Sequence, residues 1–426
     1  MNDTTRRVAI IGGSRIPFCR SNTFYADSSN MDMLTAAIDA LVQRFSLEGA
    51  QPDEVQAGAV ITHSRDFNLA REAVLSSRLS NLTPGITLGQ ACGTSLQAAL
   101  NLAGKIASGH IDSGIAAGTD TTSDAPIVFG KKFSARLIRA SQAKSPKQGL
   151  KAFKGFGPRE LKPVTPTNSE PRTGLSMGQH CERMAQEWEI SREDQDQLAY
   201  DSHRKAAAAY DDGFFDALVS PWNGVSRDNI LRADTTLEKL ASLRAVFDKG
   251  PKGTLSAGNS TTLSDGAAAV LMCSEEWAKQ HDLPVQAYLT AGRAAAIDHV
   301  NDEGLLMAPT VAVAEMLQRA GLKLQDFDLY EIHEAFAAQV LCTLKAWESE
   351  DYCTNRLGLE EALGGIDPDK MNVKGGSLAL GHPFAATGAR ILGTLAQLLE
   401  EKGSGRGLIS VCTAGGMGVS AILERP

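Results

Sequence analysis

The order of strand-like and helix-like segments is the strongest constraint that this sequence places on its fold. Residues 8–18 form an apolar run closed by glycine and proline, and residues 30–45 then place apolar side chains at helical spacing. The same succession follows between residues 55 and 120, where short strands lead into an alanine-rich helix. Alternating strands and helices of this kind predict an α/β fold.

The pattern begins again in the second part of the chain. Strand-like and helix-like segments recur through residues 286–347, and a later turn leads into a helix with Pro383 at its first position. Residues 407–424 then predict a closing pair of strands hinged on glycines. A chain of 426 residues exceeds what one hydrophobic core usually supports. We therefore expect an internal duplication, with two similar halves fused into one molecule.

A change in composition separates the two halves. Residues 126–252 contain a basic segment, a proline-containing stretch and long polar helices, and they match neither half of the repeat. We expect an insertion here, which makes the first half discontinuous. The predicted domains are residues 1–125 together with 253–280, the insertion 126–252, and residues 281–426.

The charge of the chain is unevenly distributed. A net charge of −8 argues against general nucleic-acid binding. Residues 131–162 reverse the sign, because they contain ten lysines and arginines and one acid, Glu160, so that this stretch carries +9 and the rest of the chain −17. Two interpretations stay open: a solvated loop, or a surface for an anionic ligand, an acidic partner or a lipid headgroup.

Neither a membrane span nor a disulfide framework is indicated. No run approaches the roughly 18 apolar residues that cross a bilayer, and the first residues lack the pattern of a signal peptide. The seven cysteines form no CxxC pairs and have no histidines at metal spacing. We expect a soluble, cytoplasmic protein without structural zinc, in a reducing compartment.

Two residues occupy positions where chemistry is expected. Cys92 precedes a predicted helix, where free N–H groups and the helix dipole stabilise a thiolate, although a small residue filling a tight turn is the alternative. His382 lies between Gly381 and Pro383, at a turn that nearby glycines open to a ligand. This position favours a base for Cys92 over a packed core histidine.

Two further residues have weaker local signals. Cys412 lies at a strand end before Gly415 and Gly416, where backbone N–H groups can stabilise an oxyanion, but taken singly the pattern favours a tight hairpin with a buried cysteine. His333 stands between a strand and a helix, and functional and structural roles are both open. The motif HEAF lacks the HExxH spacing, so zinc is not indicated.

Together, these segments resemble the thiolase family of acyl-CoA C-acyltransferases over essentially the whole chain. The shared motifs occur in family order and at family spacing: RIPF, QACGTSLQA, SAGNSTTLSDGAAAV, HEAFAAQ, GGSLALGHPFAATGAR and CTAGGMG. HEAFAAQ and GHPFAATGAR are most similar to the β subunit of the fatty-acid oxidation trifunctional complex, since many biosynthetic thiolases have Asn in place of His333.

The resemblance implies both a fold and a set of roles. The fold is a five-layer αβαβα sandwich of two βαβαβαββ halves, with a loop domain inserted in the first. Cys92 would be the nucleophile that carries the acyl group, His382 its activating base, and Cys412 the acid/base for the acetyl-CoA carbanion. His333 would bind the thioester oxygen, and the backbone N–H groups of Cys92 and Ala414 would form an oxyanion hole.

Two positions depart from the family pattern. Thr261 stands where serine is usual, and Ala414 replaces a frequent glycine. Both keep the hydroxyl or the backbone N–H that the role requires. The resemblance implies CoA contacts at Met177 and Thr261.

The implied reaction is cleavage of a 3-ketoacyl-CoA by CoA, or the reverse condensation, without a metal or redox cofactor. The resemblance implies that the chain forms a homodimer or homotetramer. It also implies a hydratase/dehydrogenase α subunit as partner and a membrane contact through the basic segment. Three other functions are compatible with parts of the pattern: a biosynthetic acetoacetyl-CoA thiolase, a decarboxylating ketoacyl synthase and a non-catalytic acyl-CoA-binding subunit. Cys412 argues against the synthase, because decarboxylation needs no proton-abstracting thiol. The presence of all four catalytic residues argues against the non-catalytic subunit.

Overall fold

The computed structural model describes residues 5–167, 169–301 and 303–426. Within these residues, ten strands form one mixed sheet in the order β10-β11-β12-β9-β1-β8-β5-β3-β4, and β2 pairs with β8 off this path. The strands are β1 (Val8–Arg15), β2 (Cys19–Arg20), β3 (Glu54–Gly58), β4 (Gly85–Thr87), β5 (Ser113–Asp120), β8 (Ser264–Ser274), β9 (Ala287–Ala296), β10 (Leu329–Ile332), β11 (Gly405–Thr413) and β12 (Met417–Arg425).

The strand order confirms the duplication. In the first half, β1, β8 and β5 are antiparallel neighbours, and β5 pairs with β3 in parallel. In the second half, β9, β12 and β11 are antiparallel neighbours, and β11 pairs with β10 in parallel. The two halves meet where β1 pairs with β9, through only two pairs of residues.

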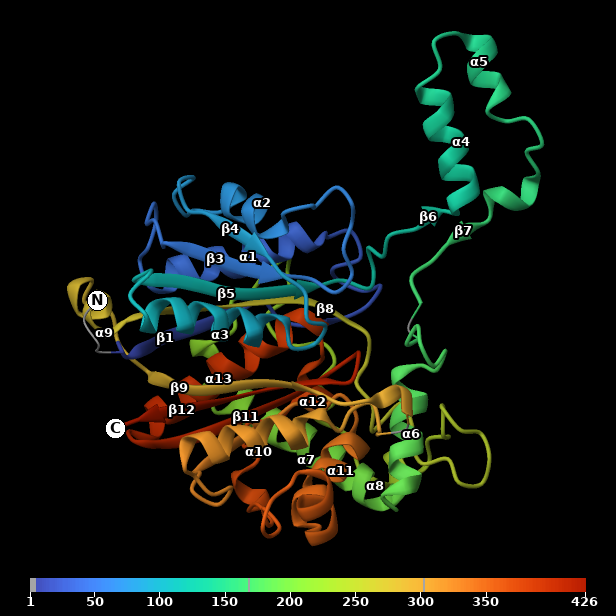
Figure 1. The fold of residues 1–426 in the computed structure, drawn as a ribbon. Coiled ribbons are helices and arrows are strands. Elements are labelled where there is room, and N and C mark those ends of the chain that lie inside the picture. The colour runs from blue at the N-terminus through green and yellow to red at the C-terminus, as the bar shows by residue number, and fades with distance from the viewer. Residues whose placement is uncertain (1–4, 168, 302) are drawn as a thin grey trace.

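The helices complete a five-layer α/β sandwich. They are α1 (Asn30–Arg44), α2 (Leu69–Ser76), α3 (Thr94–Ala107), α4 (Lys131–Ser141), α5 (Pro146–Lys151), α6 (Met177–Glu187), α7 (Arg192–Asp211), α8 (Leu237–Ala241), α9 (Glu275–Gln280), α10 (Ala308–Ala320), α11 (Ala337–Glu348), α12 (Ser377–Leu380) and α13 (Thr387–Lys402). Figure 1 shows α1 and α2 above the first group of strands, α3 and α13 between the two groups, and α10 and α11 below the second.

The insertion has two parts. One part runs from β6 (Val128–Phe129) through α4 and α5 to β7 (Pro163–Val164), and it stands away from the body of the molecule (Figure 1). We call residues 128–164 the basic hairpin. The other part, with α6, α7 and α8, lies against the body, where α6 and α7 contact α11 and α7 contacts α12. No helix in the described part of the chain is long and apolar enough to cross a bilayer.

The helix that follows His382 begins later than the sequence predicts. Pro383 is not the first residue of that helix, because residues 384–386 form a 3-10 turn and α13 begins at Thr387. The extra turn is fixed by the buried carboxylate of Asp120, which accepts a hydrogen bond from Ala385 N at 2.8 Å. This long-range bond has no local signal in the sequence.

The central helices pack on each other through a glycine. The core between the two groups of strands contains apolar side chains from α3, α13 and both halves of the sheet, including Leu96, Leu102, Val270, Ile391, Leu395 and Val419. A Cβ atom on Gly388 would lie 2.4 Å from the backbone nitrogen of Leu96. Because backbone cannot move aside as a flexible side chain can, α13 approaches α3 this closely only with glycine at position 388.

We therefore predict that Gly388→Ala lowers the free energy of unfolding by about 1–3 kcal/mol, because the added methyl group overpacks the contact between α3 and α13. Urea unfolding followed by circular dichroism measures the change. Gly104→Ala is the matched control: Gly104 lies in α3 with open space around its Cα, so alanine should raise the stability by about 0.5–1 kcal/mol. Equal effects of the two substitutions would contradict the close contact at Gly388.

Candidate active site

Cys92 lies in a tight turn between β4 and α3. Ala91 has a left-handed backbone with φ of 47°, which places the thiol at the start of the helix. Thr94 Oγ1 holds the turn, because it accepts from Gln90 N at 2.8 Å and donates to Ala91 O at 2.8 Å. The Cys92 side chain is buried among the central apolar residues.

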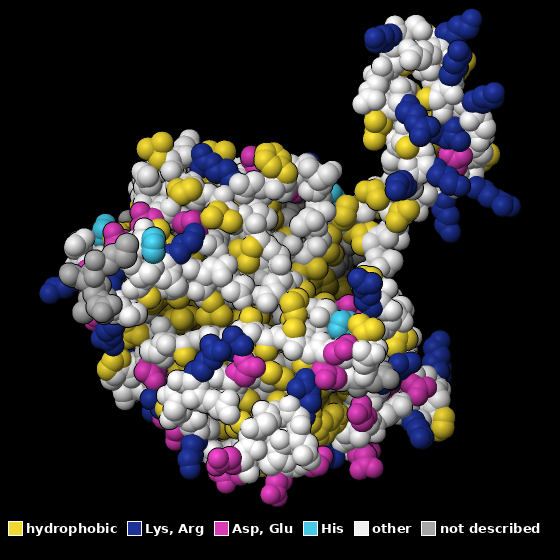
Figure 2. All heavy atoms as spheres, in the orientation of Figure 1, with side chains coloured by type: hydrophobic (Ala, Val, Ile, Leu, Met, Phe, Trp, Pro, Cys, Tyr) yellow, Lys and Arg dark blue, Asp and Glu magenta, His cyan; other side chains and the backbone are white. Residues whose placement is uncertain are grey.

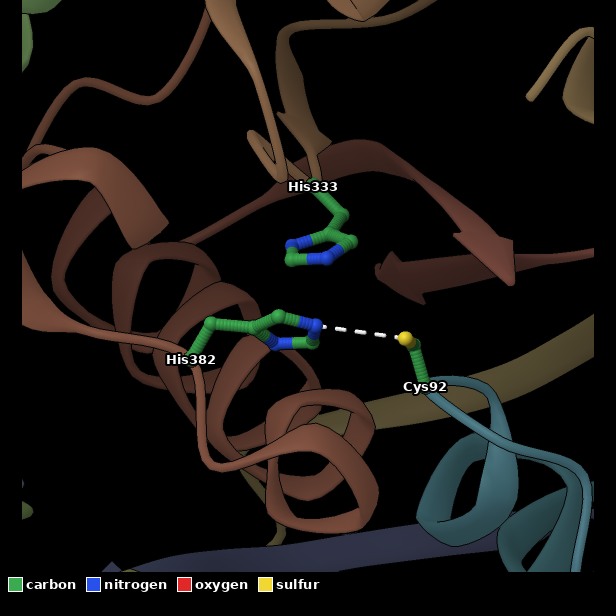
Figure 3. A group of neighbouring side chains, drawn as sticks. All are labelled: Cys92, His333 and His382. Atoms are coloured by element: carbon green, nitrogen blue, oxygen red, sulfur yellow. Dashed lines mark hydrogen bonds between the residues drawn. The ribbon is translucent and has the colours of Figure 1, made fainter. Parts of the chain in front are cut away.

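His382 comes from the second half of the chain and faces this thiol. It follows Gly381, whose φ of 99° reverses the chain after α12. The ring nitrogen Nε2 lies 3.2 Å from Cys92 Sγ, and Nδ1 lies 2.6 Å from Thr387 Oγ1 (Figure 3). The structure thus brings together the two residues that the sequence predicts as nucleophile and base, although 290 residues separate them in the chain.

His333 lies beside His382 at the end of β10. Its ring centre is 4.2 Å from that of His382, and its Nδ1 is 2.8 Å from Ser377 Oγ. The other nitrogen, Nε2, is buried without a hydrogen-bond partner among the described residues. Figure 3 shows the His333 ring above the His382 ring, with His382 joined to Cys92 by a hydrogen bond. An unsatisfied buried donor or acceptor at this point is available for a ligand.

Cys412 and Ala414 complete the group. Cys412 is buried on β11, close enough that a charged Cys92 raises the pKa of its thiol further above the usual range than burial alone does. The backbone N–H groups of Ala414 and of Cys92 itself are close enough to the Cys92 sulfur to lower the pKa of its thiol. Two convergent N–H groups are the arrangement that stabilises an oxyanion next to the nucleophile.

Burial keeps the catalytic pair neutral, so the helix-stabilised thiolate expected from the sequence is not the resting state. Loss of water raises the pKa of Cys92 to about 12, and it lowers the pKa of His382 to about 3. Burial also takes the pKa of His333 well below its usual range. The N–H groups of Ala414 and Cys92 act in the expected direction, but burial outweighs them.

Several buried groups that hold this site have no local signal in the sequence. Glu334 accepts hydrogen bonds from Ser202 Oγ at 2.7 Å, Asn372 Nδ2 at 2.6 Å and Leu378 N at 3.2 Å. These bonds connect α7, the 371–376 loop and α12 to the residue that follows His333. They fix the backbone on which His333 stands, and they depend on contacts between distant parts of the chain.

A cavity of about 320 Å³ borders the site. Its walls include Arg232, Lys239, Leu240 and Ser260, and the Ser260 hydroxyl is buried without a partner among the described residues. Thr261 itself donates its hydroxyl to Ala335 O at 3.0 Å, while its neighbours on both sides line the cavity.

Met177 is placed on the other side of the site. It is the first residue of α6 and packs on the apolar cluster that contains Cys412. The structure therefore places Met177 and Thr261 in the surroundings of the catalytic group, in different walls.

The arrangement also satisfies a geometric requirement for metal binding. One ligand atom from each of Cys92, His333 and His382 lies within 4.8 Å of the other two. Spacing alone therefore admits either a bound cation or a thiol with two imidazoles acting in acid–base chemistry.

The duplicated α/β fold places a cysteine beside a histidine, an arrangement typical of enzymes with a cysteine nucleophile. The sequence models of the thiolase N-terminal and C-terminal domains match residues 8–276 and 284–425. The chain belongs to the thiolase family.

Several known proteins align with this chain over nearly its full length. A 3-ketoacyl-CoA thiolase of Colwellia psychrerythraea is 40% identical over 99% of this chain and 98% of its own. One of Yersinia pestis is 41% identical over 98% of this chain and 97% of its own. Among solved structures, the Bacillus anthracis acetyl-CoA acetyltransferase has a TM-score of 0.82 at 28% identity, covering 99% of this chain and all of its own. Human mitochondrial 3-ketoacyl-CoA thiolase in complex with CoA has a TM-score of 0.81 at 28% identity, covering 99% and 98%.

The neutral state of His382 predicts an acid-sensitive fold. The unfolded chain binds a proton on this histidine below its ordinary pKa of 6.5, whereas the folded chain does not until about 3. The unfolded state therefore binds more protons in this window, and stability falls as the pH falls through it. His382→Gln should make the loss of stability between pH 6.5 and 4 less steep.

Urea unfolding at a series of pH values measures this slope. His110→Gln is the control, because it removes an exposed histidine far from the site. Identical slopes for wild type and His382→Gln would contradict the buried neutral imidazole.

Proposed function

We propose that this enzyme cleaves a 3-ketoacyl-CoA with CoA to give acetyl-CoA and a shortened acyl-CoA, or catalyses the reverse condensation, through an acyl group on Cys92. The observation that carries the proposal is the 3.2 Å contact between His382 Nε2 and Cys92 Sγ. The printed names of the full-length relatives support the substrate class.

The first half-reaction follows from the neutral pair. His382 Nε2 takes the thiol proton as Cys92 Sγ attacks the ketone carbon, so no charged thiolate has to wait in a dry site. The N–H groups of Cys92 and Ala414 stabilise the oxyanion of the adduct. Cleavage of the carbon–carbon bond leaves the acyl group on Cys92 and an acetyl-CoA carbanion.

The carbanion needs an electron sink and a proton. His333 Nε2 and the protonated His382 Nε2 can donate hydrogen bonds to the thioester oxygen, which accepts the negative charge. Cys412 supplies the proton to carbon, and burial suits it to this role because its thiol is held neutral. The His382 proton then passes to the Cys412 thiolate. Incoming CoA gives its thiol proton to His382 and attacks the acyl group, and Cys92 leaves as a thiol.

We also propose that CoA enters along the cavity beside the 256–262 loop. Arg232 offers positive charge to its phosphates, whereas Lys239 in the same wall is paired with Asp234 at 2.8 Å. The Ser260 hydroxyl has no partner among the described residues. Met177 and Thr261 remain the proposed contacts on the reacting side of the molecule.

The seven unpaired cysteines support a reducing compartment, and we place the enzyme in the cytoplasm.

A second copy of the chain is proposed along the outer edge of the first half. β4 ends the sheet there, and Ile86 on this strand is 42% exposed. Leu82 nearby is 75% exposed, and Phe67 is 85% exposed. An uncovered sheet edge with apolar neighbours favours pairing with another copy, which supports a homodimer or homotetramer. Membership in the trifunctional β-subunit type, with an α subunit as partner, is likewise a proposal.

We predict that Cys412→Ala still accepts an acetyl group from acetyl-CoA but loses condensation and thiolysis. Removing an acid/base group usually costs about 10²–10⁴ in rate, whereas Cys92 and His382 remain to form the acyl-enzyme. Loss of the magnesium-enolate absorbance of acetoacetyl-CoA on adding CoA measures thiolysis. The role of Cys412 would be rejected if thiolysis stayed within about tenfold of wild type. Absence of thiolysis in wild type with acetoacetyl-CoA and longer 3-ketoacyl-CoA would reject the proposed function.

We propose that the reaction requires no metal. A cation on Cys92, His333 and His382 would occupy the lone pairs that the nucleophile and the base need. Dialysis against EDTA should therefore leave thiolysis unchanged, while added Zn²⁺ should inhibit it by binding these three ligands. The enolate assay needs magnesium, so product acetyl-CoA is measured by chromatography here. Loss of activity with EDTA and recovery with one equivalent of metal would contradict this assignment.

The basic hairpin is proposed to bind an anionic lipid surface. Figure 2 shows its lysines and arginines gathered on a lobe that stands clear of the body. Apolar side chains are exposed on the same lobe: Val128, Phe129, Leu137, Ile138, Leu150, Phe156, Leu161 and Val164. Among the described residues its polar contacts are internal, for example the ion pair between Arg136 and Glu160. Exposed apolar groups surrounded by cations suit a membrane interface better than a small anion alone.

Reversing Lys144, Lys147, Lys151 and Lys154 to Glu should abolish binding to vesicles that contain anionic lipid and leave kcat and KM for CoA unchanged. The matched control reverses four cations on the body, Lys249, Lys279, Arg319 and Lys323. A rise in KM for CoA with a flatter salt dependence would show that the hairpin attracts CoA instead. Retained vesicle binding with loss of α-subunit binding would assign the hairpin to that partner.

A further inference from the structure

The buried imidazole of His333 is neutral, so it carries one proton, either on Nδ1 or on Nε2. Its Nδ1 lies 2.8 Å from Ser377 Oγ, and its Nε2 faces the site without a partner among the described residues. A neutral imidazole donates from one nitrogen and accepts at the other. Which nitrogen carries the proton therefore depends on whether Ser377 donates to Nδ1 or accepts from it.

Arg390 determines whether the Ser377 hydroxyl donates or accepts a hydrogen bond. Its Nη2 lies 2.7 Å from Ser377 Oγ, and a guanidinium only donates hydrogen bonds. The serine oxygen therefore accepts from Arg390. Among the described residues, its remaining partner is His333 Nδ1. If Nδ1 also donated to the oxygen, the serine proton would be buried without an acceptor, which is costly. The serine hydroxyl therefore donates to Nδ1.

Arg390 lies beside the buried carboxyl group of Glu331. Arg390 belongs to α13, and its Nη1 lies 3.7 Å from Glu331 Oε2 on β10, two residues before His333. Both side chains are almost fully buried. The carboxylate of Glu334 is engaged by Ser202, Asn372 and Leu378, so it does not draw the guanidinium away from Ser377. Nε and Nη1 of Arg390 have no hydrogen-bond partner among the described residues, and burial raises the pKa of Glu331 to about 8. The bond from Nη2 to Ser377 Oγ is therefore the contact that orients the guanidinium.

The two neighbouring histidines consequently hold their protons on opposite nitrogens. In the proposed mechanism His382 Nε2 accepts the proton of Cys92, and its Nδ1 then donates to Thr387 Oγ1. His333 must instead present Nε2–H if it is to bind an oxygen. We propose that Arg390 and Ser377 are positioning residues that fix His333 with its proton on Nε2, ready to donate to the thioester oxygen of the substrate. The substrate side of this inference rests on the proposed function.

The proton position is tested directly by solid-state ¹⁵N NMR of the full-length enzyme labelled at histidine nitrogens, with the His333 signals identified by their loss in His333→Ala. The wild type should show a protonated Nε2 and a bare Nδ1. Ser377→Ala and Arg390→Met should both give a mixture of the two forms. Ser377→Thr, which keeps the hydroxyl, should restore the wild-type signals. Protonated Nδ1 in the wild type, or a fixed Nε2–H in Ser377→Ala, would overturn the proposal.

Kinetics separate positioning from general loss of structure. Ser377→Ala should slow carbon–carbon cleavage by about threefold or more, but by less than the ~10²–10³ expected for His333→Ala, which removes the donor itself. Acetylation of Cys92 by acetyl-CoA should not change, because it uses the other oxyanion site.

Ser95→Ala is the control, because Ser95 is an equally buried serine that accepts a hydrogen bond from Ala389 N on α13 at 2.8 Å. Among the described residues, Ser95 forms no hydrogen bond with either histidine. A slower acetylation in Ser377→Ala than in Ser95→Ala would point to a structural role only and overturn the positioning role. The NMR result stands without catalysis: a wild type that lacks thiolysis but has the Nε2–H form rejects the proposed function and keeps the proton assignment. If Ser377→Ala fails to fold, the wild-type and Arg390→Met spectra decide.

Discussion

Exclusion of water from the contact between Cys92 and His382 is the condition on which the rest of the site depends. In water, a histidine beside a thiol can exchange its proton with the solvent. In this site burial shifts the two pKa values apart, to about 12 for the thiol and about 3 for the imidazole. Burial favours the neutral form of both groups, and the backbone N–H groups of Cys92 and Ala414 counter this only in part for the thiol.

The duplication explains how such a dry site is built. Cys92 stands at the start of α3 in the first half, whereas His333, His382 and Cys412 come from the second half. The helices α3 and α13 bring the halves together in the central layer, and Gly388 allows their backbones to approach. The reacting atoms therefore lie at the junction of two cores, where each half closes the other against water. Arg390 on α13 also lies beside Glu331 on β10, the strand that leads into His333.

Residue patterns in the sequence predicted the architecture well. The alternating strands and helices, their recurrence after residue 285 and the glycine-hinged final strands all correspond to observed elements, because they depend on local periodicity and turns. The pairing of Cys92 with His382 followed from motifs and is met by the geometry, while the roles of the four residues remain proposals. The thiolate expectation failed because the dipole of a helix start is visible in a sequence and the depth of burial is not.

Other features had no local signal at all. The late start of α13 depends on Asp120, which is 265 residues away from Ala385. The bonds of Ser377 to His333 and Arg390 likewise join three segments whose residues are ordinary in isolation. The insertion was recognised by its composition, but its division into a hairpin that stands clear and helices that pack on the body requires the three-dimensional contacts. Long-range polar contacts are thus the part of this molecule that sequence patterns do not reveal.

The central claim is that Cys92 carries the acyl group. Mixing the enzyme with acetyl-CoA, quenching in acid and mapping the peptides by mass spectrometry tests it most directly. The account predicts one acetyl group per chain, found on the peptide that contains Cys92, lost on addition of CoA and absent from Cys92→Ser. An adduct of equal yield on a peptide without Cys92, or one that survives the Cys92→Ser substitution, would contradict it.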